Sequence, residues 1–166
     1  MPKGLTYEEA SSLPEAYATS YLNLFYEGHL KEGQTAFIPA GASGLASVAI
    51  PMAKAFGARV LTSVLSDEIA SKITNLGADV IINSTKEDVS EVLKKEEEAG
   101  HPLNLAIDCL GSEKVGECFP YVAYGCRWIM IATLAGDISP VNMRTMYVKN
   151  IRLIGSTLRS KSVEVK

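Results

Sequence analysis

Short apolar runs alternate with helix-length segments along most of the chain. Each run holds four to six residues, many of them β-branched, as expected of strands that are buried on both faces of a parallel sheet. The runs that we predict as strands are Thr35–Ile38, Arg59–Ser63, Val80–Asn83, Leu103–Asp108, Arg127–Ile131 and Ile151–Gly155.

The segments between these runs carry the end signals of helices. Ser66 precedes the acids Asp67 and Glu68, which is typical of an N-cap followed by carboxylates in the first helical turn. Gly57 and Gly77 stand where two helices would end. The predicted helices are Leu13–Tyr26 with Pro14 in its first turn, Leu45–Phe56, a helix from Ser66 to about Leu76, Asp88–Ala99 and Val115–Tyr121.

This alternation predicts an α/β fold, because parallel strands are joined by right-handed helical crossovers. We expect a Rossmann-type doubly wound parallel sheet of about six strands with helices on both faces. The 166 residues are enough for one sizeable core. Residues 1–30 are expected to form a leading segment with a helix, and residues 31–166 the Rossmann domain, truncated at its C-terminal end.

Composition and charge narrow the classes of partner. A net charge of −3 and an isoelectric point near 5.4, with scattered lysines and arginines, argue against a nucleic-acid-binding surface. No apolar run approaches the ~20 residues that span a bilayer, and the N-terminus lacks an apolar signal core, so we expect a cytoplasmic protein without a membrane partner. The three cysteines lack CxxC spacing, which argues against a disulfide framework or a structural zinc site.

A small-residue cluster after the first predicted strand marks a candidate ligand site. In an open parallel sheet, ligands bind beyond the carboxyl ends of the strands, and Ala40–Gly44 lies there. Its glycines would let the backbone approach a pyrophosphate, and the next helix would offer N–H groups and the positive end of its dipole. The pattern Gly41-x-x-Gly44-x-Ala46 departs from GxGxxG, and small residues at a helix start also serve packing. The strand before it and the helix after it favour dinucleotide binding.

Several motifs occur in the same order as in one known family. The chain resembles quinone oxidoreductases of the zeta-crystallin type, in the zinc-independent branch of the medium-chain dehydrogenase/reductase superfamily, over their cofactor-binding domain alone. The matching segments cover almost the whole chain and are Leu13–Tyr21, Gly33–Gly44, Ala53–Ala58, Leu76–Asp79, Ile107–Gly111, Gly125–Trp128 and Thr157–Ser160.

The resemblance implies three groups of cofactor-binding residues. Those that would line the pyrophosphate are Gly41, Ser43, Gly44 and Leu45. Those near the nicotinamide would be Thr19, Ala132, Thr133 and Leu134. Asp108 and Cys109 would lie beside the ribose. The alternative is that Thr19 is a helical hydroxyl bonded to its own backbone and Cys109 a small buried hydrophobe, which we favour for the Cys109 side chain.

Cofactor choice depends on the residues that follow the second and third strands. An acid at the end of the second strand would bind a ribose 2′-hydroxyl and favour NAD. Here Val64 occupies that position. The lysine and tyrosine usual in NADP-preferring relatives are replaced by Ile69 and Ser84.

Two serines keep NADP as the expected cofactor, with NAD as the alternative. Ser63 and Ser66 could bond a 2′-phosphate, and Lys72 or Arg59 could approach it. Asp67 would favour NAD if it pointed at the ribose, but it is more simply explained as a first-turn carboxylate.

The resemblance also implies an activity for the full-length protein. Such an enzyme transfers a hydride from NADPH to a quinone or a related enone or carbonyl, without a metal. No residue of this chain is expected to be catalytic, and the chain alone is expected to be a fragment with little activity. Relatives commonly form homodimers through the sheet edge, here near Ile151–Gly155. The alternatives are a non-catalytic cofactor-binding or dimerising remnant and the enoyl reductase domain of a polyketide-type synthase.

Overall fold

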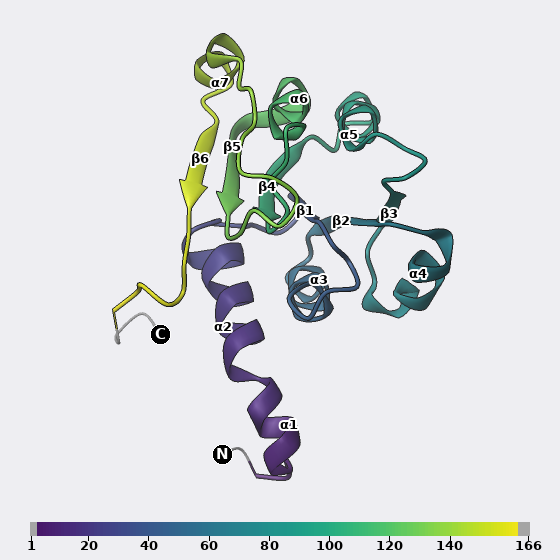
Figure 1. Cartoon of the computed structure of the whole chain (residues 1–166), viewed down its shortest axis with the longest axis vertical. Helices are drawn as coiled ribbons and strands as arrows, with labels where there is room; N and C mark the ends of the chain where they lie inside the picture. Colours follow the sequence, from purple (N-terminus) through teal and green to yellow (C-terminus); the bar gives the residue numbers. More distant parts are fainter. Residues whose placement is uncertain (1–2, 163–166) are drawn as a thin grey trace.

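The computed structural model describes residues 3–162, and its centre is a six-stranded parallel sheet in the order β3-β2-β1-β4-β5-β6 (Figure 1). Every neighbouring pair of strands runs parallel. The expected doubly wound Rossmann fold is confirmed, since this order reverses direction between β1 and β4. The strands are β1 (Thr35–Ile38), β2 (Arg59–Val64), β3 (Val80–Asn83), β4 (Leu103–Asp108), β5 (Val122–Met130) and β6 (Arg152–Gly155).

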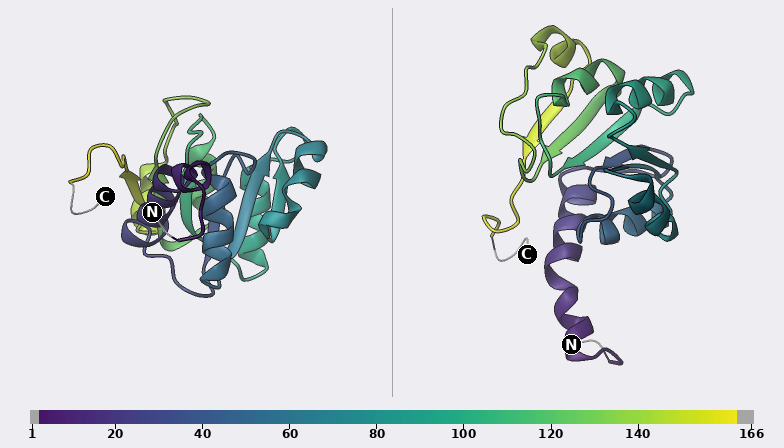
Figure 2. Two further views of the ribbon diagram at one scale, coloured as in Figure 1. Left: turned by 90° about the horizontal axis from the view of Figure 1, so that it is seen from below. Right: turned by 45° about the vertical axis from the view of Figure 1, so that its right-hand side comes forward.

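Helices cover both faces of the sheet (Figures 1 and 2). One face carries α2 (Pro14–Tyr21), α3 (Ala46–Ala55) and α4 (Asp67–Lys72). The other carries α5 (Val89–Glu98), α6 (Val115–Cys118) and α7 (Met143–Val148). Before α2, α1 (Tyr7–Ser12) extends away from the sheet (Figure 2).

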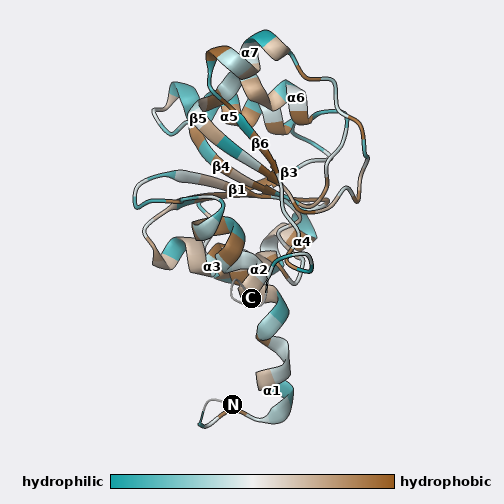
Figure 3. Cartoon of the chain, turned by 90° about the vertical axis from the view of Figure 1, so that its left-hand side faces the viewer, coloured by the Kyte–Doolittle hydropathy of each residue, from teal (hydrophilic) through white to brown (hydrophobic). Residues whose placement is uncertain are grey.

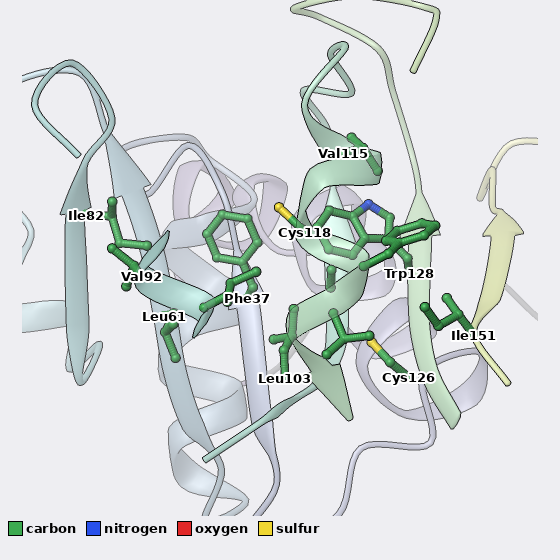
Figure 4. Packing of buried hydrophobic residues seen from close by; sticks show 14 residues of the cluster. Phe37, Leu61, Ile82, Val92, Leu103, Val115, Cys118, Cys126, Trp128 and Ile151 are labelled. Carbon is green, nitrogen blue, oxygen red and sulfur yellow. The ribbon is translucent and has the colours of Figure 1, made fainter. Parts of the chain in front are cut away.

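Two hydrophobic clusters hold the layers together, one on each face of the sheet. Successive strand residues point to opposite faces, so Phe37 joins the cluster under α5 and α6 while Ile38 joins the one under α3. The first cluster includes Phe37 and Trp128 (Figure 4). The Trp128 ring lies 6.4 Å from that of Phe37 and 5.6 Å from that of Phe119. Apolar strands are thus sandwiched between helices whose outer faces are more polar (Figure 3).

Two predicted helices change type before they end. The helix expected over Leu13–Tyr26 is α-helical only to Tyr21, and Leu22–Tyr26 form a π-helical turn that buries Leu24 completely. The helix expected over Val115–Tyr121 ends at Cys118 and continues as a 3₁₀ turn, Phe119–Tyr121. Pro120 has no N–H to continue the α-helical ladder, which explains the second change.

Other boundaries differ by a few residues. The helix after Ser66 ends at Lys72 and is followed by a 3₁₀ turn, Thr74–Leu76, and a left-handed Gly77. β5 begins at Val122 rather than Arg127, and its pairing with β4 shifts register in the stretch that contains the left-handed Gly125. The additional strand residues, 122–126, lack the continuous apolar pattern on which the prediction of this strand depended.

Two short helices were missed. α1 begins with a capping box in which the Thr6 amide donates to Glu9 Oε2 at 2.8 Å and the Glu9 amide to Thr6 Oγ1 at 3.2 Å. α7 is capped by Asn142, whose Oδ1 accepts from the Thr145 amide at 3.0 Å. Each has six residues, too few to show a helical period, although the capping residues are readable in the sequence.

Candidate functional site

The loops that follow the six strands gather along one edge of the sheet, which we call the carboxyl edge. Because the strands are parallel, all of their carboxyl ends meet there, and the arrowheads of β5 and β6 point toward α2 in Figure 1. The strand order places the loops after β3 and β2 at one end, the loop after β1 in the middle, and those after β4, β5 and β6 at the other end.

The two glycines of the loop after β1 have different surroundings. Gly41 is buried, its amide donates to the Ser63 carbonyl at 2.8 Å, and a Cβ at this position would lie 2.5 Å from Thr62 Oγ1 and 2.8 Å from Ile73 Cδ1. Gly44 is exposed, and a Cβ there would meet no atom within 4 Å. Packing therefore requires a glycine at 41 but does not require one at 44.

Backbone donors are left over in this turn. Ser43 caps α3, because its hydroxyl accepts from the Ala46 amide at 3.1 Å and its carbonyl from the Ser47 amide at 3.0 Å. Within the described part of the chain, the amides of Gly44 and Leu45 make no hydrogen bond. Unpaired amides beside the start of a ten-residue helix form a setting that attracts an anion.

A cavity of about 260 Å³ opens beside this turn, on the face of α5 and α6. It is mostly apolar, and we call it the apolar cavity. Leu65 and Ser84 border it from the ends of β2 and β3, and Leu110 borders it from the loop after β4. At its rim, Asp88 Oδ2 pairs with Lys114 Nζ at 2.7 Å and Asp88 Oδ1 accepts from Ser90, which together lower the pKa of Asp88 to about 2.

Asp108 and Cys109 lie at the end of β4, as expected, but the Asp108 carboxylate is bonded within the protein. It is buried and accepts from Trp128 Nε1 at 3.0 Å and from the amides of Leu110 and Gly111 at 2.8 and 3.0 Å. Burial raises the pKa of Asp108, while these hydrogen bonds oppose the rise. Burial also raises the pKa of the Cys109 thiol, which supports its interpretation as a small buried hydrophobe.

Serines and a charged pair occupy the loops after β2 and β3. Ser66 caps α4, since its hydroxyl accepts from the Ile69 amide at 3.2 Å, and the hydroxyl of Ser84 donates to the Val64 carbonyl at 3.1 Å. Ser63 is buried at the end of β2.

Asp67 forms an ion pair with Lys86 and accepts from Asn83 Nδ2 at 2.6 Å, and both contacts lower its pKa. Lys86 was not singled out from the sequence. Arg59, by contrast, begins β2 and therefore lies at the opposite edge, where it binds Glu96 at 2.7 and 3.1 Å, so the expectation that it could approach a 2′-phosphate is wrong. Lys72 pairs with Glu68 in the last turn of α4.

A second cavity, of about 440 Å³, lies at the other end of the carboxyl edge, and we call it the polar cavity. Its walls come from α2 and the π turn, with Thr19 and Asn23, and from the ends of β5 and β6, with Ile131 and Ser156–Ser160. Thr19 Oγ1 has no hydrogen-bond partner within residues 3–162, whereas the neighbouring Ser20 hydroxyl donates to the Ala16 carbonyl at 2.7 Å. The backbone-bonded interpretation therefore describes Ser20 rather than Thr19.

The loop after β5 holds the remaining predicted residues, Ala132, Thr133 and Leu134. The Leu134 amide donates to the Cys109 carbonyl at 3.1 Å, which ties this loop to the loop after β4. Its side chain is 79% exposed. The amides of Ala132 and Thr133 have no hydrogen-bond partner among the residues that the structure describes.

The predicted site residues thus all lie on the carboxyl edge, at its two ends and its centre. Asn23, Lys86 and Ser156 also lie along this edge and were not singled out from the sequence. Asn23 follows Thr19 by four residues and Ser156 follows β6 directly, so the helical period and the strand rule are the signals that could have found them.

Two further observations concern ligand and membrane classes. Among residues 3–162, no three His, Cys, Asp or Glu side chains gather where they could hold a metal ion. No helix in that range has the length and apolar character needed to cross a bilayer.

Comparison with known proteins identifies relatives that share this domain. The model of the zinc-binding dehydrogenase family matches residues 44–165. The chain is 27% identical to quinone oxidoreductase-like protein 2 of Mus musculus over 157 residues, which are 93% of this chain and 44% of the mouse protein. A stretch of 68 residues, 41% of this chain, is 43% identical to 3% of a highly reducing polyketide synthase of Emericella nidulans.

A solved quinone oxidoreductase from Thermus thermophilus, determined also in complex with NADPH, superposes with a TM-score of 0.79 at 27% identity. The match covers 95% of this chain and 49% of that one. The chain therefore spans less than half the length of these relatives. The expected likeness to the cofactor-binding domain of quinone oxidoreductases is confirmed.

Proposed function

The chain belongs to the zinc-binding dehydrogenase family, in which it corresponds to the NAD(P)-binding domain of an oxidoreductase, and from this premise we propose that it binds NADPH along the carboxyl edge. The observation that carries the proposal is the order of three sites along that edge: the apolar cavity, the glycine turn with unpaired amides, and the polar cavity. This order suits an extended dinucleotide, with an aromatic base, a central pyrophosphate and a polar nicotinamide.

The glycine turn fits the pyrophosphate. The amides of Gly44 and Leu45 point to no described acceptor, and the open space at Gly44 would let an anionic oxygen approach the backbone. Ser43 keeps its hydroxyl proton available while its oxygen caps α3. Gly41 contributes indirectly, because it seats the turn against Thr62.

The two cavities fit the two ends of the cofactor. In the apolar cavity, Leu65 and Leu110 would contact the adenine, with Ser63 and Ser66 beside the ribose. Thr19 and the backbone of Ala132 and Thr133 would border the nicotinamide, which supplies the hydride when bound. The work of these residues is to orient the ring and to keep water from it.

Cofactor choice is proposed to depend on the pair Asp67 and Lys86. A 2′-phosphate would compete with the Asp67 carboxylate for the Lys86 ammonium, whereas a 2′-hydroxyl would donate to Asp67. Lys86 stands near the end of β3, where the usual tyrosine position is Ser84, and it supplies a positive charge that Ile69 lacks. NADP is therefore the proposed cofactor and NAD the weaker ligand.

In the full-length protein, the hydride is proposed to pass to a quinone or a related enone or carbonyl. The likeness to quinone oxidoreductase-like protein 2 and to the Thermus thermophilus enzyme supports this acceptor class. The local likeness to a polyketide synthase favours enoyl reduction as the second candidate. The edge strand β6, with exposed Arg152 and Leu153, is the proposed homodimer contact.

Titration of the chain with NADPH and NADH tests the proposal. Quenching of Trp128, the single tryptophan, reports binding because its ring lines the apolar cavity. We expect saturable binding of both cofactors, tighter for NADPH. Absence of saturable binding to either would reject the cofactor-domain proposal and favour a non-catalytic dimerising remnant.

A further inference from the structure

Two buried polar side chains in the wall of the polar cavity have atoms without a hydrogen-bond partner. Asn23 is 1% exposed and Ser156 is 3% exposed. Among the described residues, Asn23 Oδ1 and Ser156 Oγ find no donor or acceptor. Buried polar groups in native proteins are nearly always bonded, and an unpaired one destabilises the fold. A second group that completes these bonds would explain why both side chains are present.

The local structure of the π turn determines which atom of Asn23 is left over. Asn23 Nδ2 donates to the Thr19 carbonyl at 2.8 Å, so Oδ1 is the unpaired atom. The opposite orientation of the amide would place Oδ1 against the Thr19 carbonyl, an acceptor facing an acceptor, so the nitrogen occupies that position. π-Helical turns occur frequently at functional sites, and this one begins at Leu22, three residues after Thr19.

The unpaired groups have a definite chemistry. Asn23 Oδ1 can only accept a hydrogen bond, and the Ser156 hydroxyl can donate one. Both residues line the same cavity as Thr19, although Asn23 comes from the π turn and Ser156 from the end of β6. A neutral group with an N–H donor beside a carbonyl acceptor would satisfy both. A primary carboxamide is such a group.

We infer that Asn23 and Ser156 form the binding site for the carboxamide of the nicotinamide. Asn23 Oδ1 accepts from the carboxamide NH₂, and the Ser156 hydroxyl donates to its carbonyl. This inference rests on the proposed function, because it places the nicotinamide end of the cofactor in the polar cavity. It adds that this chain selects and orients the ring through two side chains, and not by backbone contacts alone.

The test compares two ligands that differ by the nicotinamide. Dissociation constants for NADPH and for 2′-phospho-ADP-ribose, which lacks the nicotinamide, are measured by isothermal titration calorimetry. Asn23→Leu is expected to weaken NADPH binding about five- to tenfold and to leave 2′-phospho-ADP-ribose binding unchanged. Ser156→Ala, on a different element, is expected to give the same selective loss.

Ser20→Ala is the matched control, because Ser20 is fully buried in α2 next to the π turn, bonds to the Ala16 carbonyl and does not line the cavity. For Ser20→Ala, the ratio of the dissociation constants for NADPH and 2′-phospho-ADP-ribose is expected to equal that of the wild type. Thermal unfolding of the unliganded Asn23→Leu chain is a second readout. The variant is expected to melt close to the wild type, because the loss of the Nδ2 bond to the Thr19 carbonyl is offset by the removal of an unpaired buried acceptor.

The outcomes separate this inference from the proposal beneath it. Equal weakening of both ligands, or unchanged NADPH binding in both variants, would overturn the carboxamide site while leaving the cofactor domain intact. Wild-type chain that binds neither ligand would overturn the proposed function and the inference with it.

Discussion

The two cavities of the carboxyl edge differ in how their polar side chains are used. In the apolar cavity, the Asp108 carboxylate is bonded to Trp128 and two backbone amides, and Asp88 is bonded to Ser90 and Lys114. In the polar cavity, Asn23 and Ser156 carry buried atoms without partners in the described chain. Internal hydrogen bonds thus hold the polar groups of one cavity, whereas the other retains buried polar atoms that have no partner among the described residues.

The glycine turn between the cavities combines both behaviours. A Cβ at position 41 would meet close neighbours, whereas a Cβ at position 44 would meet none within 4 Å. The same contrast therefore gives each variant at this edge an expected class of effect. Changes to buried groups that are bonded internally should lower stability, and changes to unpaired groups should lower affinity.

The largest effect is expected at Asp108. Asp108→Ala would leave the buried Trp128 Nε1 and the partly buried amides of Leu110 and Gly111 without their acceptor, so the free energy of unfolding should fall by about 3 kcal/mol. Urea denaturation followed by Trp128 fluorescence measures the loss, with the exposed Asp137→Ala as control. A loss under about 1 kcal/mol, within the range of an ordinary surface change, would break the contrast between the cavities.

The two glycines should separate stability from binding. Gly41→Ala is expected to lower the free energy of unfolding by about 1–3 kcal/mol, because its Cβ would overlap Thr62 and Ile73. Gly44→Ala should change it by less than about 0.5 kcal/mol and weaken NADPH binding about tenfold. Thermal melts and cofactor titrations of both variants decide the matter. Comparable destabilisation by both substitutions would contradict the division of roles.

The charged pair should control discrimination between cofactors. Lys86→Gln is expected to weaken NADPH binding about tenfold and to leave NADH binding unchanged, because only the 2′-phosphate needs the ammonium. Asp67→Asn should have the opposite effect and increase the preference for NADPH over NADH. If neither substitution moves that ratio, the 2′-phosphate does not contact Lys86.

The smallest effect is expected at Asp88. Its pKa in the folded chain is about 2, below the ordinary value of 3.8, so its contribution to stability is present above pH 4 and is lost as the pH falls toward 2. The contribution should stay under about 1 kcal/mol because both partners are partly exposed. Asp88→Asn should flatten the acid limb of the unfolding free energy measured from pH 5 to 2. An unchanged limb would show that the Lys114 pair is not stabilising.

The sequence predicts the buried strands well and the side-chain partnerships poorly. β1, β3 and β4 begin and end where their apolar runs do, because strands buried on both faces need a continuous apolar run. Asp108 was read correctly as the end of a strand, but its bond to Trp128 spans 20 residues and depends on the register of β4 with β5. No local pattern encodes that register.

For the candidate site, too, only the local part could be predicted from the sequence. The glycine turn is local, and its strand–turn–helix context was readable. The polar cavity joins a π turn near the N-terminus to the end of β6, and the Asp67–Lys86 pair joins two loops, so both emerge only when the chain folds. Asn23 lay inside a segment read as a regular helix, in which its unpaired oxygen could not be foreseen.

The most direct test of the account is a ¹H–¹⁵N NMR titration of the 17.8 kDa chain with NADPH. The amides of Gly44 and Leu45, which have no internal acceptor in the described chain, should show the largest shift changes, followed by the Asn23 side-chain amide. The Gly41 amide, already bonded to Ser63, should change less. If saturating NADPH leaves the amides of residues 41–45 unshifted, or shifts only resonances of residues away from the carboxyl edge, the assignment of this edge as a dinucleotide site is contradicted.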